Sequence, residues 1–176
     1  MHLLRKKQWE IIELEIQPCT SADREWVRQK IIGTWGAETI VVHDTIYHPA
    51  ELPGFIAREG SEVIGLLTYH IQNTACEIVT IDSWHERQGI GSALINALKQ
   101  IAIHERCRRL WLVATNDNLA ALRFYQKRGF TISAVHINAI EKSRQLKPEI
   151  PLLGCDGIPI RDEIELELRL GDQGKV

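Results

Sequence analysis

The chain has 176 residues, a formal net charge of −2 and an apolar fraction of 44%, all ordinary values for a soluble globular protein. Its length suffices for one hydrophobic core, so we expect a single domain over residues 1–176. The near-neutral charge argues against a nucleic-acid or membrane partner recognised by general electrostatics.

The first fifteen residues contain no long apolar run and carry three glutamates. This composition argues against a signal peptide or a membrane-spanning segment at this end. The four cysteines show no C-x-x-C spacing, which predicts unpaired thiols in a reducing compartment. Together these features predict a cytoplasmic protein.

The first third of the chain predicts a strand, a helix and a second strand. Alternating apolar and polar residues predict a strand over 11–17. The sequence Thr20-Ser21-Ala22-Asp23 resembles a capping box, so a helix should begin there and stop at Gly33. A short strand is predicted over 39–43, and the two prolines in 47–53 indicate a loop.

The rest of the chain predicts a hairpin followed by alternating strands and helices. The hairpin strands are expected over 54–58 and 62–70, with a turn at Gly60. Strands are then predicted over 75–81, 109–114, 131–140 and 163–170. Helices are predicted over 91–104 and 119–128, and a loop over 142–159. Strict alternation in the last strand predicts one face in water. The order indicates a mixed sheet covered by helices, in the α/β (α+β) class.

The segment Glu86-Arg87-Gln88-Gly89-Ile90-Gly91 joins a predicted strand to a predicted helix. The first amides of a helix lack carbonyl partners and, with the positive end of the helix dipole, they suit a phosphate. A dinucleotide-binding turn needs a third glycine where Leu94 stands, and a P-loop needs Gly-Lys-Ser/Thr. These residues alone leave two interpretations open, a phosphate-binding turn of another kind and an ordinary glycine turn.

Two segments together resemble the GNAT superfamily of N-acetyltransferases. The glycine turn is similar to the family's pyrophosphate loop, Gln/Arg-x-x-Gly-x-Gly/Ala, except that Glu86 stands first. The segment 118–130 is similar to the pattern Asn-x-x-Ala-x-x-Phe-Tyr-x-x-x-Gly-Phe at every fixed position. The resemblance implies the GNAT acyltransferase fold, a mixed, mostly antiparallel twisted sheet flanked by helices with splayed central strands. It also implies acetyl-CoA as the acyl donor.

The same resemblance implies where acetyl-CoA binds. The pantetheine arm would lie between strands that end near Ser83 and Ala114, with the pyrophosphate on the amides of the glycine turn. Asn118 would contact the donor near the pantetheine arm, and Tyr125 would lie beside the sulfur. The expected cofactor-binding residues are Ile81, Asp82, Ser83, Arg87, Gln88, Gly89, Ile90, Gly91, Ser92, Asn118 and Tyr125.

Transfer of an acetyl group to an amine sets demands on the side chains. A lysine-like amine has a pKa of about 10.4, so neutralising it at pH 7 costs roughly 4–5 kcal/mol and favours a general base. The resemblance points to Glu77, which by alternation shares a face with Val79 and Ile81. A main-chain N–H near 81–83 would bind the oxyanion, and Tyr125 would protonate the leaving thiolate. Without the resemblance, a solvated glutamate and a buried aromatic are the alternatives.

The acceptor stays open between a small-molecule amine and a peptide or protein amine. Segments 35–53 and 142–159 are expected to wall the acceptor side, with His43 interpreted as a surface or capping histidine. The seven histidines form no H-E-x-x-H motif and no cluster with cysteines, so no catalytic metal is predicted. A non-catalytic acyl-CoA-binding module on the same fold is the alternative function. The family also suggests a homodimer paired through 163–170.

Overall fold

The computed structural model describes residues 14–85 and 88–171. Its strands are β1 (Leu14–Pro18), β2 (Ile40–Val42), β3 (Thr45–Tyr47), β4 (Gly54–Glu59), β5 (Glu62–Gln72), β6 (Ala75–Ser83), β7 (Arg109–Thr115), β8 (Thr131–His136) and β9 (Glu163–Arg169). Its helices are α1 (Arg24–Trp35), α2 (Ile90–His104), α3 (Leu119–Gln126) and α4 (Ala139–Leu146), with 3-10 turns η1 (Ser21–Asp23), η2 (Pro49–Glu51) and η3 (Cys155–Gly157). Within the described residues, no helix is long and apolar enough to cross a membrane.

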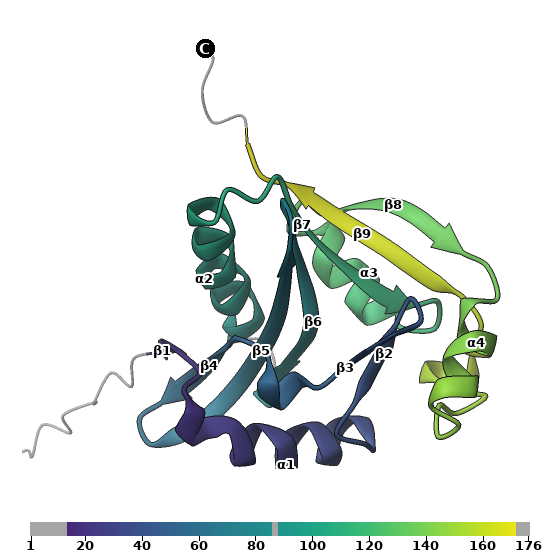
Figure 1. The fold of residues 1–176 in the computed structure, drawn as a ribbon, viewed down its shortest axis with the longest axis horizontal. Helices are drawn as coiled ribbons and strands as arrows, with labels where there is room; N and C mark the ends of the chain where they lie inside the picture. The colour runs from purple at the N-terminus through teal and green to yellow at the C-terminus, as the bar shows by residue number, and fades with distance from the viewer. Residues whose placement is uncertain (1–13, 86–87, 172–176) are drawn as a thin grey trace, which may run out of the picture.

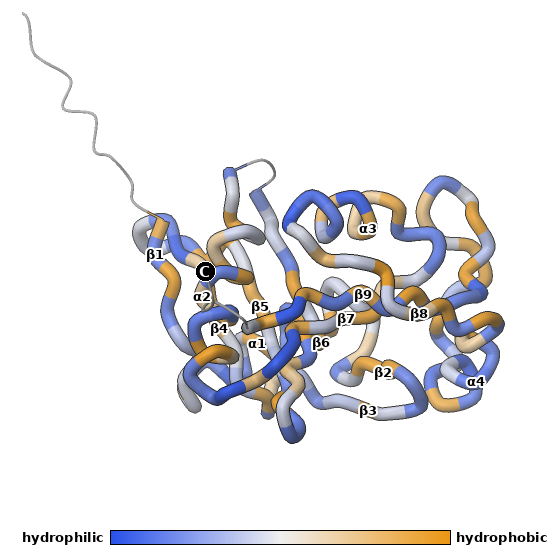
Figure 2. Tube along the Cα trace, turned by 90° about the horizontal axis from the view of Figure 1, so that it is seen from above, coloured by the Kyte–Doolittle hydropathy of each residue, from blue (hydrophilic) through white to orange (hydrophobic). Residues whose placement is uncertain are grey.

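Seven of these strands form one mixed sheet in the order β1-β4-β5-β6-β7-β9-β8, and β2 pairs with β3 in a separate hairpin (Figure 1). Neighbours in the sheet are antiparallel except β6 and β7, which are parallel. Helices α2 and α3 pack on one face, and α1 with the β2–β3 hairpin covers the other. Figure 2 shows α3 and the hairpin on opposite faces of the β7–β9–β8 part. The predicted mixed sheet flanked by helices is therefore confirmed.

Helix α2 shows why the predicted helical pattern forms the core. Leu94, Leu98 and Ala102 recur at four-residue steps and all are 0% exposed. Such spacing places side chains along one stripe, here against the central strands. Burying one leucine contributes about 1.5–3 kcal/mol relative to leaving it in water.

Strands β6 and β7 pair over a short stretch and then separate. Their pairing runs from Ala75 opposite Arg109 to Glu77 opposite Trp111, although both strands continue beyond it (Figure 1). Each strand pairs on its other side, with β5 and β9 respectively. Main-chain groups on the facing edges therefore have no ladder partner within the described residues. The splayed central strands implied by the sequence resemblance are present.

A bulge in β6 changes which residues share a face. Thr80 and Ile78 stand opposite consecutive residues of β5, so Val79 between them is the extra residue. An inserted residue reverses the alternation that follows it. Val79 packs in the core under α1, whereas Ile81 packs in the core under α2. The prediction that Glu77 shares a face with Ile81 is wrong, because strict alternation takes no account of a bulge.

Several predicted boundaries differ from the structure, most of them by one to three residues. Helix α1 passes through Gly33 and ends at Gly36, whose φ is 77°; a glycine inside a helix costs only about 1 kcal/mol. The strand predicted over 131–140 ends earlier, and part of the predicted loop 142–159 belongs to α4. The short strand β3 was not predicted, because three residues carry too little periodicity.

Strand β9 is neither wet on one face nor free at an edge. It lies between β7 and β8 and carries alternating hydrophilic and hydrophobic residues (Figure 2). Glu163 is only 2% exposed, and the side chains of Glu165 and Glu167 are 15% and 14% exposed. The polar face is therefore charged but largely covered, in part by the β2–β3 turn. A homodimer cannot form by strand pairing through β9, because both of its edges are already paired, one with β7 and the other with β8.

Candidate active site

The turn into α2 presents main-chain amides without helical partners. Gly89 precedes the helix with a left-handed φ of 77°, and it offers no side-chain cap. The amide of Ala93 bonds to the Gly89 carbonyl at 3.0 Å, so the amides of Ile90, Gly91 and Ser92 come before the first intrahelical bond. Gln88 and Gly89 are exposed. This helix end can receive an anion.

The two glycines of this turn are needed for different reasons. A Cβ on Gly91 would stand 2.8 Å from Cζ of Phe124, so a glycine here allows α2 to pack against α3. A Cβ on Gly89 would meet no atom within 4 Å, and only its left-handed backbone favours glycine. The predicted donor contact Arg87 lies outside the described residues, as does Glu86.

Arg128 adds a positive charge to this turn. Its Nε and Nη2 donate to Oγ of Ser92 at 2.9 and 2.6 Å, and its Nη1 donates to the Phe124 carbonyl at 2.7 Å. The guanidinium also stacks 3.5 Å from the centroid of the Phe124 ring. The sequence did not single out Arg128, because it occupies one of the unspecified positions of the second motif.

The end of β6 offers main chain rather than side chains to the space between β6 and β7. The Ile81 side chain packs in the core under α2. Oδ2 of Asp82 accepts from Nε1 of Trp35 at 3.3 Å, and burial raises the pKa of the Asp82 carboxyl. Oγ of Ser83 donates to the His85 carbonyl at 3.0 Å. This agrees with a role for 81–83 through backbone groups.

Asn118 and Tyr125 stand at the two ends of α3. Oδ1 of Asn118 caps the helix by accepting from the Ala121 amide at 3.0 Å, which leaves its Nδ2 as the group free for other contacts. Tyr125 is 5% exposed, and its ring packs edge-on against Phe124 and Phe130.

Two effects raise the pKa of the Tyr125 phenol, first its burial and then the nearby Asp82 carboxylate, while Arg128 opposes them. Tyr125 therefore keeps its proton at neutral pH. Tyr125 packs in the same core cluster as Ile81, near the end of β6.

Glu77 stands at the last paired position of β6 before the strands separate. It is 4% exposed, and its Oε2 accepts from the Tyr47 hydroxyl at 2.7 Å. Its Oε1 is buried without a partner among the described residues. Burial raises the pKa of Glu77, whereas the Tyr47 hydrogen bond and the charge of His43 oppose that shift. A solvated strand glutamate, the alternative left open by the sequence, does not describe this side chain.

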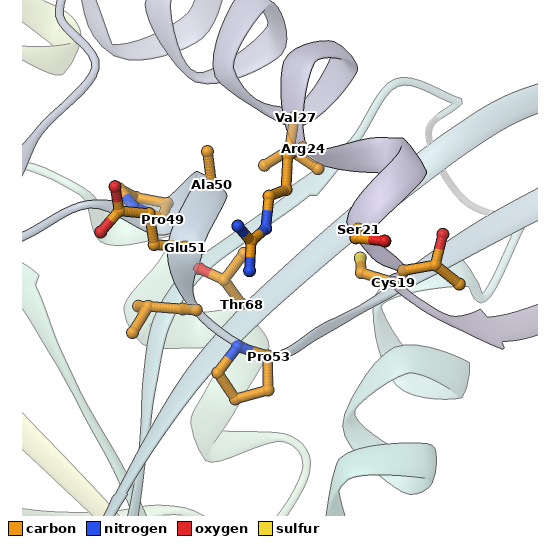
Figure 3. A pocket seen from close by; sticks show the side chains of 11 residues that line it. Cys19, Ser21, Arg24, Val27, Pro49, Ala50, Glu51, Pro53 and Thr68 are labelled. Atoms are coloured by element: carbon orange, nitrogen blue, oxygen red, sulfur yellow. The ribbon is translucent and has the colours of Figure 1, made fainter.

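Glu77 lines a pocket of about 280 Å³ on the α1 face of the sheet. The pocket is lined by His70, Gln72, Asn73, Thr74, Ala75, Glu77, Arg109 and Trp111. A second pocket of about 200 Å³ lies between the start of α1 and η2, and the Arg24 side chain points into it (Figure 3). That second pocket contains none of the predicted site residues.

The two segments expected to wall the acceptor side contact one another. Nζ of Lys147 donates to the carbonyls of Trp35 and Thr39 at 3.2 and 2.9 Å. His43 belongs to the first segment; it was predicted to be a surface or capping histidine, and it lies partly buried in the turn between β2 and β3. Its side chain is 27% exposed, and its Nδ1 lies 3.0 Å from Oε2 of Glu163.

Comparison with known proteins supports the interpretation of these two motifs. Residues 9–130 match the model of the acetyltransferase (GNAT) family. The chain belongs to the GNAT acetyltransferase family. This acetyltransferase is 47% identical over 131 residues to the protein YdhI of Bacillus subtilis (strain 168), a match that covers 74% of this chain and 82% of the relative.

Two solved structures share the fold of this acetyltransferase. The IAA acetyltransferase from Bacillus cereus ATCC 14579 has a TM-score of 0.66 and 20% identity, over 90% of this chain and 100% of that one. A GNAT family acetyltransferase from Elizabethkingia anophelis, solved with acetyl-CoA bound, has a TM-score of 0.64 and 20% identity, over 89% of this chain and 98% of that one. At this identity the likeness shows the fold.

A first prediction concerns Arg128. Arg128→Ala should weaken CoA binding about tenfold, since one charge-assisted contact contributes about 1.5–3 kcal/mol and solvent replaces part of it. Arg123→Ala, which removes an exposed arginine from the neighbouring α3, is the matched control and should bind as the wild type does. Calorimetric titration with CoA measures both. Equal affinity in the two variants would exclude Arg128 from the donor site.

Proposed function

We propose that this acetyltransferase moves an acetyl group from acetyl-CoA to the nitrogen of a primary amine, by direct attack within a ternary complex. One observation carries the proposal: β6 and β7 stop pairing directly after Glu77, although both strands continue. The separated strands provide a slot, the uncapped amides of α2 an anion site, and the side chains of Glu77 and Tyr125 a base and an acid.

The residues present fit acetyl-CoA as the donor. The amides of residues 88–92 and the guanidinium of Arg128 suit a pyrophosphate, which needs several N–H donors and positive charge. The unpaired edges of β6 and β7 suit the two amide groups of a pantetheine arm, which bind a strand edge as another strand does. Nδ2 of Asn118 is a further donor at the start of α3, since Oδ1 of the same side chain is taken by the Ala121 amide.

In the proposed mechanism, Glu77 accepts a proton from the amine so that the nitrogen lone pair can attack the thioester carbonyl. Burial raises the pKa of Glu77 toward neutral pH. A general base works best when its pKa lies near the pH of the reaction. An unpaired amide of β6 between Val79 and Ser83 donates to the oxyanion. The C–N bond forms and the C–S bond breaks, and Tyr125 donates its proton to the leaving sulfur. The second proton on the attacking nitrogen leaves to solvent as the amide forms, and solvent returns a proton to Tyr125. Direct attack leaves no acetylated side chain.

A panel of amines tests the proposal. Polyamines, aminoglycoside-like amines, amino acids, lysine peptides and peptides with free N-termini would each be incubated with acetyl-CoA, with thiol release as the readout. We expect at least one amine to release CoA, to gain an acetyl group by mass, and to show sequential rather than ping-pong kinetics. Tight donor binding without turnover across the panel would contradict catalysis and favour a non-catalytic acyl-CoA-binding module.

Tyr125→Phe tests the proposed acid. This variant keeps the ring packing and removes only the hydroxyl, so turnover should fall about a hundredfold, in the range of general acid catalysis. The acetyl-CoA dissociation constant should stay within about twofold. Tyr69→Phe removes a phenol from the same core and is the matched control. Turnover equal to wild type in Tyr125→Phe would remove this residue from the acid role.

A further inference from the structure

A group of metal-ligating side chains lies over the β8–β9 part of the sheet, close to Glu77 but without that residue as a member. The two-residue turn between β2 and β3 brings His43 over the sheet, where its ring centroid lies 4.3 Å from that of His136 on β8. Glu165 of β9 lies beside both rings. One ligand atom from each of these three residues lies within 4.8 Å of the other two. We call His43, His136 and Glu165 the His2Glu cluster.

Both imidazoles direct one nitrogen at the same carboxylate oxygen. Nε2 of His43 lies 3.8 Å from Oε2 of Glu165, and Nε2 of His136 lies 3.7 Å from it. These distances are too long for hydrogen bonds. Both Nε2 atoms are buried and have no hydrogen-bond partner among the residues that the structure describes. Buried polar atoms without partners are rare in proteins, and a bound ion would supply the missing interaction.

The other oxygen of Glu165 is already occupied. Its Oε1 accepts from Nη1 of Arg109 at 3.0 Å and from Oγ of Ser133 at 2.9 Å. These two donors orient the carboxylate so that Oε2 faces the two imidazoles. The cluster therefore presents two nitrogens and one oxygen. When both imidazoles are neutral and carry their proton on Nδ1, all three of these atoms are lone-pair acceptors.

The spacing of these atoms suits a tetrahedral ion. Ligands about 2.0–2.2 Å from Zn²⁺ in tetrahedral geometry stand about 3.4 Å apart. The two observed separations from Oε2, 3.7 and 3.8 Å, are slightly larger, and the ligand atoms of all three residues lie within 4.8 Å of one another, so the cluster would have to close inward around the ion. Two imidazoles with one carboxylate favour zinc and its transition-metal neighbours over magnesium or calcium, which prefer oxygen ligands alone.

A buried carboxylate behind His43 supports the same assignment. Oε2 of Glu163 lies 3.0 Å from Nδ1 of His43 as a charge contact without hydrogen-bond geometry, and Glu163 is 2% exposed. A carboxylate at this nitrogen favours the tautomer that carries its proton on Nδ1, which leaves Nε2 as a lone-pair donor. Histidines that ligate metals commonly hold a carboxylate in this position, and that partner fixes the ring orientation.

We propose that His43, His136 and Glu165 bind one transition-metal ion, with Zn²⁺ the best fit, through His43 Nε2, His136 Nε2 and Glu165 Oε2. The ion ties the β2–β3 turn to β8 and β9, and its fourth position stays open to water or another ligand. It has no part in the acetyl transfer described above, whose steps use only side-chain and main-chain groups. Sequence patterns miss this site because its ligands come from three strands or turns far apart in the chain.

Titration of the tag-free, chelator-treated full chain with ZnCl₂ tests the proposal by calorimetry, with CoCl₂ and visible absorption as a second probe. We expect one site per chain, a zinc-dependent rise in Tm, and the absorption of tetrahedral Co²⁺. His136→Gln should weaken zinc binding more than about a hundredfold, because it removes a direct ligand, and Glu163→Gln should weaken it about 10–100-fold. His104→Gln alters a histidine that is 82% exposed and should bind zinc as the wild type does.

CoA titration of the same preparations shows whether each variant is folded. If His136→Gln fails to fold, Glu165→Gln provides the test in its place, with the same expected loss. The proposal is overturned if the wild type binds no zinc, or if a folded ligand variant binds zinc as tightly as the wild type.

Discussion

Gly89→Glu should abolish detectable binding of CoA and acetyl-CoA while the fold stays intact. The side chain at this position points into open space, so the variant has room to fold. Its carboxylate would stand at the uncapped end of α2, where it would both repel a pyrophosphate and occupy the amides that should receive it. We expect the dissociation constant for CoA to rise more than a hundredfold, which corresponds to about 2.8 kcal/mol or more.

The matched control is Gly60→Glu in the turn between β4 and β5. Gly60 has a left-handed φ of 61° and, like Gly89, would bring an added Cβ within 4 Å of no atom. Both variants therefore carry the same kind of backbone strain, about 1–2 kcal/mol, and only one lies at the proposed anion site. Calorimetry with CoA and the Tm of each variant separate strain from binding. Equal loss of CoA affinity in both variants would contradict the anion site.

Glu77→Gln should lower kcat/KM about 10²–10⁴-fold, the range that a general base contributes. The glutamine keeps the shape and an acceptor for the Tyr47 hydroxyl but cannot take a proton. Donor affinity should stay unchanged, because the proposed donor contacts lie on other residues. Initial rates with the amine identified by the panel measure the effect, and Glu62→Gln, an exposed change at the start of β5, is the control. Wild-type rates in Glu77→Gln would exclude it as the base.

The pH dependence of Glu77 follows from the direction of its pKa shift. Burial raises its folded pKa above the ordinary value of 4.5, so the wild-type rate should fall as pH drops through that raised pKa. Stability changes in the opposite sense. The contribution of Glu77 is fully present below its unfolded pKa and is lost as pH rises through the folded pKa. Glu77→Gln does not titrate, so its Tm at pH 7 should equal or exceed that of the wild type. A lower Tm would contradict the burial argument.

The parts of the fold that the sequence predicted are those fixed by local patterns. The capping box at Thr20 and Asp23 is present, and Gly60 and Gly129 have the left-handed backbones expected of a turn and a helix end. Helix α2 lies one residue from its predicted start because its apolar stripe is long and regular. Predicted boundaries were wrong where tertiary contacts outweigh a residue that usually ends a helix. At Gly33, for example, the helix continues to a second glycine, Gly36.

The candidate site was predictable where a motif names the residue and unpredictable where contacts are long-range. Tyr125 is buried, as expected of an aromatic residue of the second motif. The effect of Asp82 on its pKa could not be predicted, because the two residues are far apart in the sequence. The bulge at Val79 moves Ile81 to the face of the sheet opposite Glu77. No residue type in the sequence predicts such an insertion. The Tyr47 hydrogen bond to Glu77 joins a hairpin to a distant strand, so only the folded chain reveals it.

The proposed donor site depends most directly on hydrogen bonds from the α2 amides to a diphosphate. Calorimetry measures this binding. The wild type is titrated with CoA and, in parallel, with pantetheine, which lacks the diphosphate, and the two dissociation constants are compared. We predict one CoA site per chain and an affinity for pantetheine at least about a hundredfold weaker, since the charge-assisted contacts would be lost. Absence of CoA binding, or equal affinity for the two compounds, would contradict the account.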